Sequence, residues 1–223
     1  MKIVISLGGS VIIPNKVDLE YLEKFKRLIL KLKKKHKIII VTGGGKTART
    51  YINALEKDGL DKKTLAYIGI FTTRLNARLV AALFKLKKIP STEKELKKMI
   101  KKERLVVTGA LGFHPNMTSD GTAAEAAMHL NADLFINITN VNGLYTKDPK
   151  KFKEAKIIKQ ISFKDFFKIA RKIKFRAGQH FVLDKKAAEI IYKNRIKTAI
   201  VNRGVKNIVN LLSGKKYVGT TIS

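Results

Sequence analysis

Two clusters of glycine, each directly after a short apolar run, are the residues in this sequence whose types and spacing best suit chemistry. Gly8-Gly9-Ser10 follows residues 3–7, and Gly43-Gly44-Gly45 follows residues 38–42, with Lys46 and Arg49 behind it. Glycine lets the backbone approach an anion without a Cβ in the way, and free N–H groups at a turn or helix start then bind the phosphate. The two clusters predict two phosphorylated ligands.

Neither cluster matches the common phosphate-binding motifs. A P-loop would need glycine five positions before Gly45, and that position is Ile40, inside the apolar run. The spacing G-x-G-x-x-G of dinucleotide-binding folds is absent after Ser10 and after Lys46. These two superfamilies are therefore disfavoured.

Two further loops are rich in polar side chains. Residues 112–120 end at Asp120, which heads an alanine-rich helical segment. Residues 139–149 contain turn-forming pairs with Tyr145 between them, and an aromatic ring in a polar turn can stack on a base. Because strand-to-helix loops of α/β sheets form ligand sites, we expect both loops near the bound ligands.

Alternating strand and helix patterns must position these loops. Apolar runs predict strands at residues 3–7, 38–41, 105–108, 134–138 and 198–201. Helical spacing predicts helices at 19–32, with Asp18 as the cap, and at 47–57, 65–85, 123–128, 163–173 and 183–193, with a short basic helix after Thr92. The alternation predicts one α/β domain over residues 1–223, with a mainly parallel sheet and helices on both faces. Residues 214–223 are expected to add an antiparallel edge.

The composition is strongly basic, with 47 Lys and Arg against 17 Asp and Glu and a formal net charge of +30. Nucleic acid is therefore a hypothesis to weigh. The lysines, however, are spread over nearly every helical segment instead of forming one stripe interleaved with aromatic residues. We expect solvated lysine faces, some attraction for anionic substrates and no specific nucleic-acid partner.

Metal, redox and membrane classes find little support in the sequence. There is no cysteine, and the histidines His36, His114, His129 and His180 show no ligand spacing. No apolar run approaches the ~18 to 20 residues of a membrane span, and the first residues do not form a signal peptide. We expect a cytoplasmic protein with no tightly held metal and no membrane partner.

With these motifs in this order, the sequence resembles the amino acid kinase superfamily, and most closely the archaeal type of uridylate kinase. The resemblance covers essentially the whole chain. It rests on residues 7–11, Gly43-Gly44-Gly45-Lys46 with Ala48-Arg49, residues 68–77, His114-Pro115 with Thr118-Ser119-Asp120, and residues 139–151. It implies a three-layer αβα sandwich that transfers a phosphoryl group from ATP to UMP, giving UDP for pyrimidine nucleotide biosynthesis. It also implies a homohexamer built as a trimer of dimers.

The resemblance further implies a role for each matched residue, with UMP bound by the N-terminal half and ATP by the C-terminal half. ATP would contact Gly9, Ser10, Gly45, Arg49, Thr139, Asn140, Tyr145 and Asp148. UMP would contact Gly44, His114, Pro115, Asn116, Met117, Thr118 and Ser119. Asp120 would organise the reacting centre, and Arg176 or Lys46 would supply positive charge. The attacking phosphate oxygen is already largely deprotonated at neutral pH, so alignment and charge suffice, with Mg²⁺ bridging the nucleotide phosphates.

Four positions depart from the family pattern. Ala66 and Asn142 stand where aspartate is usual, Phe113 replaces a small polar residue, and Ser6 replaces a lysine of the wider superfamily. Three alternatives stay open: a sister kinase for another phosphate or carboxylate such as isopentenyl phosphate, a non-enzymatic relative that binds nucleotides or oxyanions, and a basic nucleic-acid-binding protein. Kinases of isopentenyl phosphate usually have histidine just after the second glycine loop, where this chain has Arg49.

Overall fold

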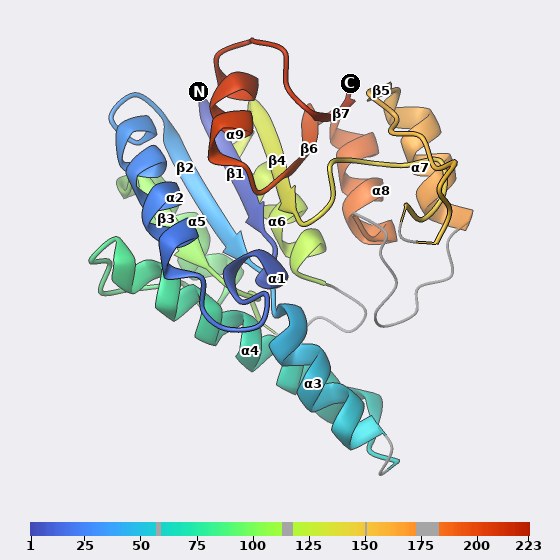
Figure 1. Ribbon diagram of the computed structural model, residues 1–223. Helices are drawn as coiled ribbons and strands as arrows, with labels where there is room; N and C mark the ends of the chain where they lie inside the picture. Colours follow the sequence, from blue (N-terminus) through green and yellow to red (C-terminus); the bar gives the residue numbers. More distant parts are fainter. Residues whose placement is uncertain (57–58, 113–117, 150, 173–182) are drawn as a thin grey trace.

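A seven-stranded sheet forms the centre of the computed structural model, which describes residues 1–56, 59–112, 118–149, 151–172 and 183–223 (Figure 1). The strands are β1 (Lys2–Leu7), β2 (Lys37–Thr42), β3 (Leu105–Thr108), β4 (Leu134–Thr139), β5 (Gln160–Ile161), β6 (Thr198–Asn202) and β7 (Gly219–Ile222). They lie in the order β3-β2-β1-β4-β6-β7-β5, and every neighbouring pair except β6 and β7 is parallel. The predicted mainly parallel α/β sheet is confirmed.

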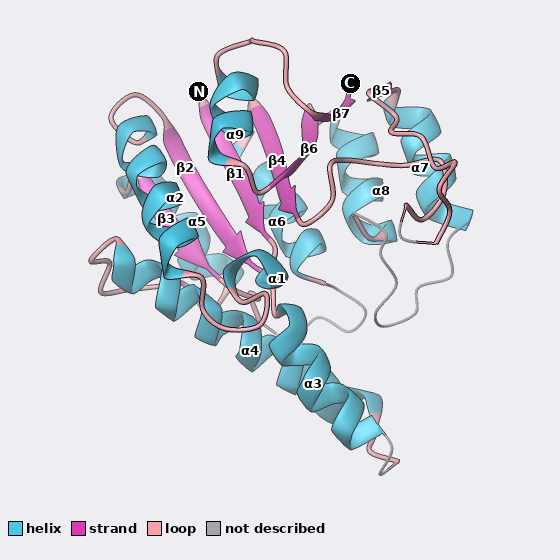
Figure 2. Cartoon of the chain, in the orientation of Figure 1, coloured by secondary structure: helices cyan, strands magenta, loops and turns pink. Residues whose placement is uncertain are grey.

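Helices cover both faces of this sheet (Figure 2). They are α1 (Gly9–Ile12), α2 (Leu19–Leu32), α3 (Gly45–Glu56), α4 (Lys62–Leu83), α5 (Glu93–Lys102), α6 (Ser119–Leu130), α7 (Phe163–Lys172), α8 (Lys185–Asn194) and α9 (Val205–Leu212). Alternate residues of each strand point to opposite faces. Ile3 and Ile5 of β1 therefore pack with α2, α4 and α9, whereas Val4 packs with the core formed by α5, α6, α7 and α8. The result is the expected three-layer αβα sandwich.

The helices α3 and α4 pack together, and Figure 1 shows that α3 and the first part of α4 extend beyond the sheet. Asp61 caps α4, because its carboxylate accepts hydrogen bonds from the backbone N–H groups of Lys63 and Thr64. Four large apolar side chains of this pair of helices are exposed: Tyr51, Tyr67, Phe71 and Leu75. This projection thus presents apolar surface away from the core.

Most of the predicted elements are present, and α2 begins after Asp18, the expected cap, whose carboxylate accepts from Tyr21 N at 3.0 Å. The sequence analysis did not predict α1, α9 or β5. It expected the last residues to form an antiparallel edge; β7 is antiparallel to β6, but the edge strand beside it is β5, which pairs with β7 in parallel. None of the described helices combines the length and apolar character needed to cross a membrane.

Candidate active site

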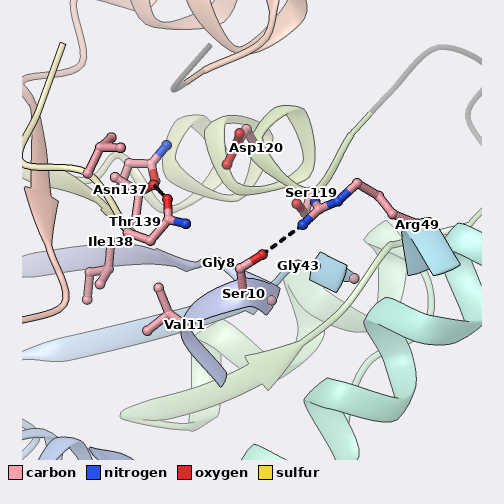
Figure 3. A pocket seen from close by; sticks show the side chains of 15 residues that line it. Gly8, Ser10, Val11, Gly43, Arg49, Ser119, Asp120, Asn137, Ile138 and Thr139 are labelled. Carbon is pink, nitrogen blue, oxygen red and sulfur yellow. Dashed lines mark hydrogen bonds between the residues drawn. The ribbon is translucent and has the colours of Figure 1, made fainter. Parts of the chain in front are cut away.

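The glycine loops and the loop after β4 meet at one edge of the sheet because β1, β2 and β4 are neighbouring parallel strands. A cavity of about 190 Å³ opens at their carboxyl ends, where α/β sheets commonly bind ligands (Figure 3). The residues that line it are Gly8, Gly9, Ser10, Val11, Gly43, Gly44, Gly45, Arg49, Ser119, Asp120, Asn137, Ile138, Thr139, Asn140 and Val141. Loops predicted separately from the sequence therefore share one cavity.

The two glycine loops pack directly against each other, backbone to backbone. A Cβ on Gly9 would lie 2.3 Å from Gly45 N, and a Cβ on Gly45 would lie 2.3 Å from the carbonyl carbon of Gly9. Gly45 also has φ of +63°, which disfavours any other residue. Asn76 of α4 supports the second loop, since its side-chain amide donates to Gly43 O at 2.7 Å. Only glycine at positions 9 and 45 allows this contact, and both glycines line the cavity.

Arg49 connects the two loops through its side chain. It lies in the second turn of α3, and its guanidinium Nη2 donates to Ser10 Oγ at 3.1 Å (Figure 3). A planar guanidinium has further donors, so it can bind the oxygens of a phosphate while it keeps this bond. Lys46 points elsewhere: its Nζ donates to Asn15 Oδ1 at 3.0 Å, and Lys46 is not among the lining residues. The positive charge at this cavity therefore comes from Arg49 among the described residues that line it.

Asp120 brings a carboxylate to the same cavity from the first turn of α6. Its Oδ1 accepts a hydrogen bond from Ser6 Oγ of β1 at 2.9 Å. Burial in the protein raises the pKa of Asp120 from 3.8 to about 7; the negative charge of Asp184 adds to this shift, and the bond from Ser6 opposes it. Asp120 is therefore partly protonated near neutral pH in the absence of a bound ligand.

The residues before Asp120 begin the helix and border the glycine loops. Thr118 is the N-cap of α6, and its Oγ1 accepts from Asp120 N at 3.1 Å. The sequence analysis placed Asp120 at the head of the helix, and the structure gives the capping role to Thr118. Ser119 lines the cavity, with its Oγ 3.2 Å from the place where a Cβ on Gly43 would lie.

The loop after β4 contributes polar groups from the other side of the cavity. Asn137, Thr139 and Asn140 line it, and Thr139 Oγ1 donates to Asn140 Oδ1 at 3.5 Å (Figure 3). Tyr145 and Asp148 lie further along the chain and are not among the lining residues; Tyr145 forms a β-bridge with Ile157. Of the four ATP contacts predicted in this loop, Thr139 and Asn140 thus line the cavity, and Tyr145 and Asp148 do not.

Several predicted positions are not among the described residues that line the cavity. Arg176, His114, Pro115, Asn116, Met117 and Phe113 lie outside the described residues. Ala66 is half-buried on α4 and is not among the lining residues, and Asn142 accepts a hydrogen bond from Asn202 Nδ2 at 2.8 Å.

Sequence reasoning gave no role to Asn137, Asn76 or Asp184. Asn137 is a buried amide inside an apolar strand, paired in register with Ser6. A polar residue in such a run is the signal that points to it. Asp184 directly precedes α8, where aspartate is a common N-cap, but the predicted helix began at residue 183 and so hid this signal.

Fold and cavity together define an α/β protein in which two glycine loops line one cavity at the carboxyl ends of neighbouring parallel strands. Comparison with known proteins identifies the family: the model of the amino acid kinase family matches residues 1–202. The chain belongs to the amino acid kinase family, and the predicted kinase class is confirmed.

Similarity to individual relatives extends over the full chain. The uridylate kinase of Pyrococcus abyssi is 38% identical over 226 residues, covering 100% of this chain and 99% of the relative. The uridylate kinase of Thermoplasma volcanium is 39% identical over 222 residues, covering 99% and 96%. The crystal structure of uridylate kinase from Archaeoglobus fulgidus superposes with a TM-score of 0.85 at 36% identity, covering 100% of both chains. The resemblance to archaeal uridylate kinases is therefore confirmed.

Proposed function

We propose that this protein transfers the γ-phosphoryl group of ATP to UMP, giving ADP and UDP, a step of pyrimidine nucleotide biosynthesis. One observation carries the proposal: two glycine loops in backbone contact, together with Arg49 and the start of α6, surround a single cavity in a chain that aligns with uridylate kinases over its full length. Two phosphate groups bound side by side in such a cavity are placed for direct transfer from one to the other.

The chemistry asks the protein for alignment and positive charge. The acceptor phosphate oxygen is already largely deprotonated near neutral pH, so no general base is required. We assign the ATP phosphates to Gly9, Ser10, Gly45 and Arg49, and the UMP phosphate to Gly44 with Thr118 and Ser119. Thr139 and Asn140, followed by Tyr145 and Asp148, would hold the nucleoside of ATP. Asp120 would organise the charges between the two ligands.

Mg²⁺ fits this cavity as a companion of ATP. In the described segments, no three His, Cys, Asp or Glu side chains group together to hold a metal ion. Mg²⁺ commonly keeps its waters and binds substrate phosphates with little help from the protein. Bound with ATP, the ion would neutralise charge on the β- and γ-phosphates, while Arg49 and the N–H groups of the glycine loops orient the same phosphates.

The acceptor is tested by release of ADP with ATP, Mg²⁺ and a panel of acceptors: UMP, dUMP, CMP, isopentenyl phosphate, acetylglutamate and no acceptor. We expect ADP to be released fastest when UMP is the acceptor. Release no faster with UMP than without an acceptor would refute the proposal, and release with isopentenyl phosphate alone would replace it with the sister-kinase reading.

Arg49 provides a second test of the phosphate site. Arg49→Met keeps the length of the side chain and removes its charge, so we expect kcat/KM for ATP to fall by about 10- to 100-fold, the value of one charge-assisted hydrogen bond. The matched control is Arg78→Met, because Arg78 is exposed on α4 and donates to Lys87 O. Equal effects of both substitutions would show that Arg49 does not contact the nucleotide.

We also propose that the chain assembles as a homohexamer, a trimer of dimers, as the resemblance implies. The exposed stripe on α4 supports self-association: Phe71 and Leu75 are 62% and 65% exposed, and the ring of Tyr67 stacks on that of Phe71. Light scattering during size-exclusion chromatography gives the mass directly. A mass of about 25 kDa, that of one chain, would contradict assembly, and Phe71→Glu is expected to lower the mass of the assembly.

A further inference from the structure

Asp184 lies where the first turns of α6 and α8 meet, and its carboxylate binds both. Oδ1 accepts from Ala187 N at 2.8 Å and so caps α8. Oδ2 accepts from Gly121 N at 3.2 Å and from the Thr118 hydroxyl, both at the start of α6. One side chain therefore holds the N-termini of two neighbouring helices together.

The helix end held in this way is the one that carries Asp120. Thr118 Oγ1 donates to Asp184 and also accepts from Asp120 N at 3.1 Å, and Gly121 directly follows Asp120. Residues on both sides of Asp120 are thus bound to Asp184. A change at Asp184 is expected to move the Asp120 carboxylate relative to the glycine loops across the cavity.

The groups around Asp120 show what sets its charge. From β1 the Ser6 hydroxyl donates to it, from β4 the Asn137 amide lines the same cavity, and from α8 comes the negative charge of Asp184. Arg49 of α3 also lines the cavity, but its guanidinium donates a hydrogen bond to Ser10. In the described part of the chain, no Lys, Arg or His side chain forms an ion pair with Asp120.

We propose that Asp184 is a positioning residue of the kinase reaction, which fixes Asp120 at the wall of the cavity by holding the first turns of α6 and α8 together. The inference rests on the proposed function for its link to turnover. The carboxylate of Asp184 has a second effect, because a nearby negative charge disfavours ionisation of Asp120. Asp184 does not line the cavity, so it acts through Asp120 and not on the substrates.

The test is Asp184→Asn, which separates the charge from the helix cap. Asparagine caps a helix as well as aspartate does, so the bond from Ala187 N and the fold are expected to stay. The amide nitrogen replaces Oδ2 and cannot accept from Gly121 N, and the negative charge is gone. We expect kcat with UMP to fall by about 10- to 100-fold with little change in KM, as misplacement of a catalytic group does.

The pH dependence distinguishes positioning of Asp120 from simple structural support. Without the charge of Asp184, Asp120 ionises at lower pH, so the inflection of kcat that it causes should move to lower pH. The direction is the same whether the ionised or the protonated form of Asp120 is active. An unchanged kcat would overturn the positioning role, and an unmoved inflection would refute the effect of the Asp184 charge on Asp120.

A readout without turnover keeps this test independent of the proposed substrate. The carboxyl carbon of ¹³C-labelled Asp120 reports its titration by NMR, assigned by its loss in Asp120→Asn, and its midpoint should be lower in Asp184→Asn. An unchanged midpoint would refute the electrostatic link even if UMP proved to be the wrong acceptor. If Asp184→Asn does not fold, Asp184→Ser, which also caps a helix, should give the same downward shift.

The matched control is Asp165→Asn. Asp165 lies in the first turn of α7, is exposed, and accepts from the Ser162 hydroxyl at 2.7 Å, so it also supports a helix start. We expect its substitution to leave kcat and the inflection as in the wild type. The same downward shift in this control would show that any loss of a carboxylate from this basic protein moves the profile, and the proposal would fail.

Discussion

Asp120→Asn should change how the stability of the protein depends on pH. Burial and the charge of Asp184 raise the pKa of Asp120 from 3.8 to about 7 in the folded protein, against the opposing effect of the bond from Ser6. A carboxyl group whose pKa is raised on folding binds a proton more tightly in the folded state. Its contribution to stability is therefore fully present below about pH 4 and is lost as the pH rises through about 7.

The size of the effect follows from the two pKa values. One pKa unit corresponds to about 1.4 kcal/mol, so the full contribution is up to about 4 kcal/mol. Between pH 5 and pH 8 the wild type should lose about 2 to 3 kcal/mol relative to Asp120→Asn, because asparagine does not titrate. Asp120 reaches the cavity, where solvent screens its charge, so these values are upper bounds.

The assay is equilibrium unfolding in urea at constant ionic strength, followed by far-ultraviolet circular dichroism because the chain has no tryptophan. The difference between the two proteins at each pH isolates Asp120, since all other titrating groups are shared. Ser6→Ala provides an internal check: it removes a bond that lowers the pKa of Asp120, so the loss should extend to higher pH. A difference that stays constant from pH 5 to pH 8 would refute the reasoning.

Three further predictions concern turnover and the glycine loops. Asp120→Asn should lower kcat by ~10²-fold or more in the folded protein, whereas a residue that only starts a helix would leave steady-state turnover almost unchanged. Gly45→Ala should lower the melting temperature and abolish turnover. The control is Gly214→Ala, which has a similar φ of +67° but nothing within 4 Å of the added Cβ, so it should lower the melting temperature only through backbone strain. Equal losses of melting temperature in the two variants would contradict the argument that crowding requires glycine at position 45. Ala66→Asp should lower KM for UMP by about 10-fold and increase the preference for UMP over dUMP, because it supplies a carboxylate whose hydrogen bond to the ribose is worth ~1.5 to 3 kcal/mol. A wild-type preference for UMP above ~100-fold that the aspartate leaves unchanged would contradict this prediction.

The strands next to the cavity could be predicted because each one carries its own signal. The strands β1, β2 and β4 are apolar runs buried on both faces, and Gly8 and Gly43 follow the first two of them directly. β5 has two residues, Gln160 and Ile161, and exists because they pair with β7. No pattern within two residues can indicate a strand, so β5 lay beyond prediction.

The contacts that organise the cavity join residues far apart in the sequence, and local sequence patterns cannot predict such contacts. Thr118 and Asp184 are 66 residues apart, and Asn76 reaches Gly43 across 33. The sequence identified Arg49 and Asp120 as polar residues beside ligand loops, but the bonds from Arg49 to Ser10 and from Ser6 to Asp120 required the fold. The resemblance to a family supplied the roles of these residues, and the structure supplied their neighbours.

The direct backbone contact of Gly9 with Gly45 has a consequence for the order of ligand binding. At this contact the backbones of the loops that follow β1 and β2 touch directly, with no side chain between Gly9 and Gly45. We therefore expect a phosphate that orders one loop to order the other as well. The second ligand then binds to a loop that is already ordered, so the two ligands bind with positive cooperativity. By reciprocity, a non-hydrolysable ATP analogue should strengthen binding of UMP by the same factor as UMP strengthens binding of the analogue, and titration calorimetry in both orders measures the two factors.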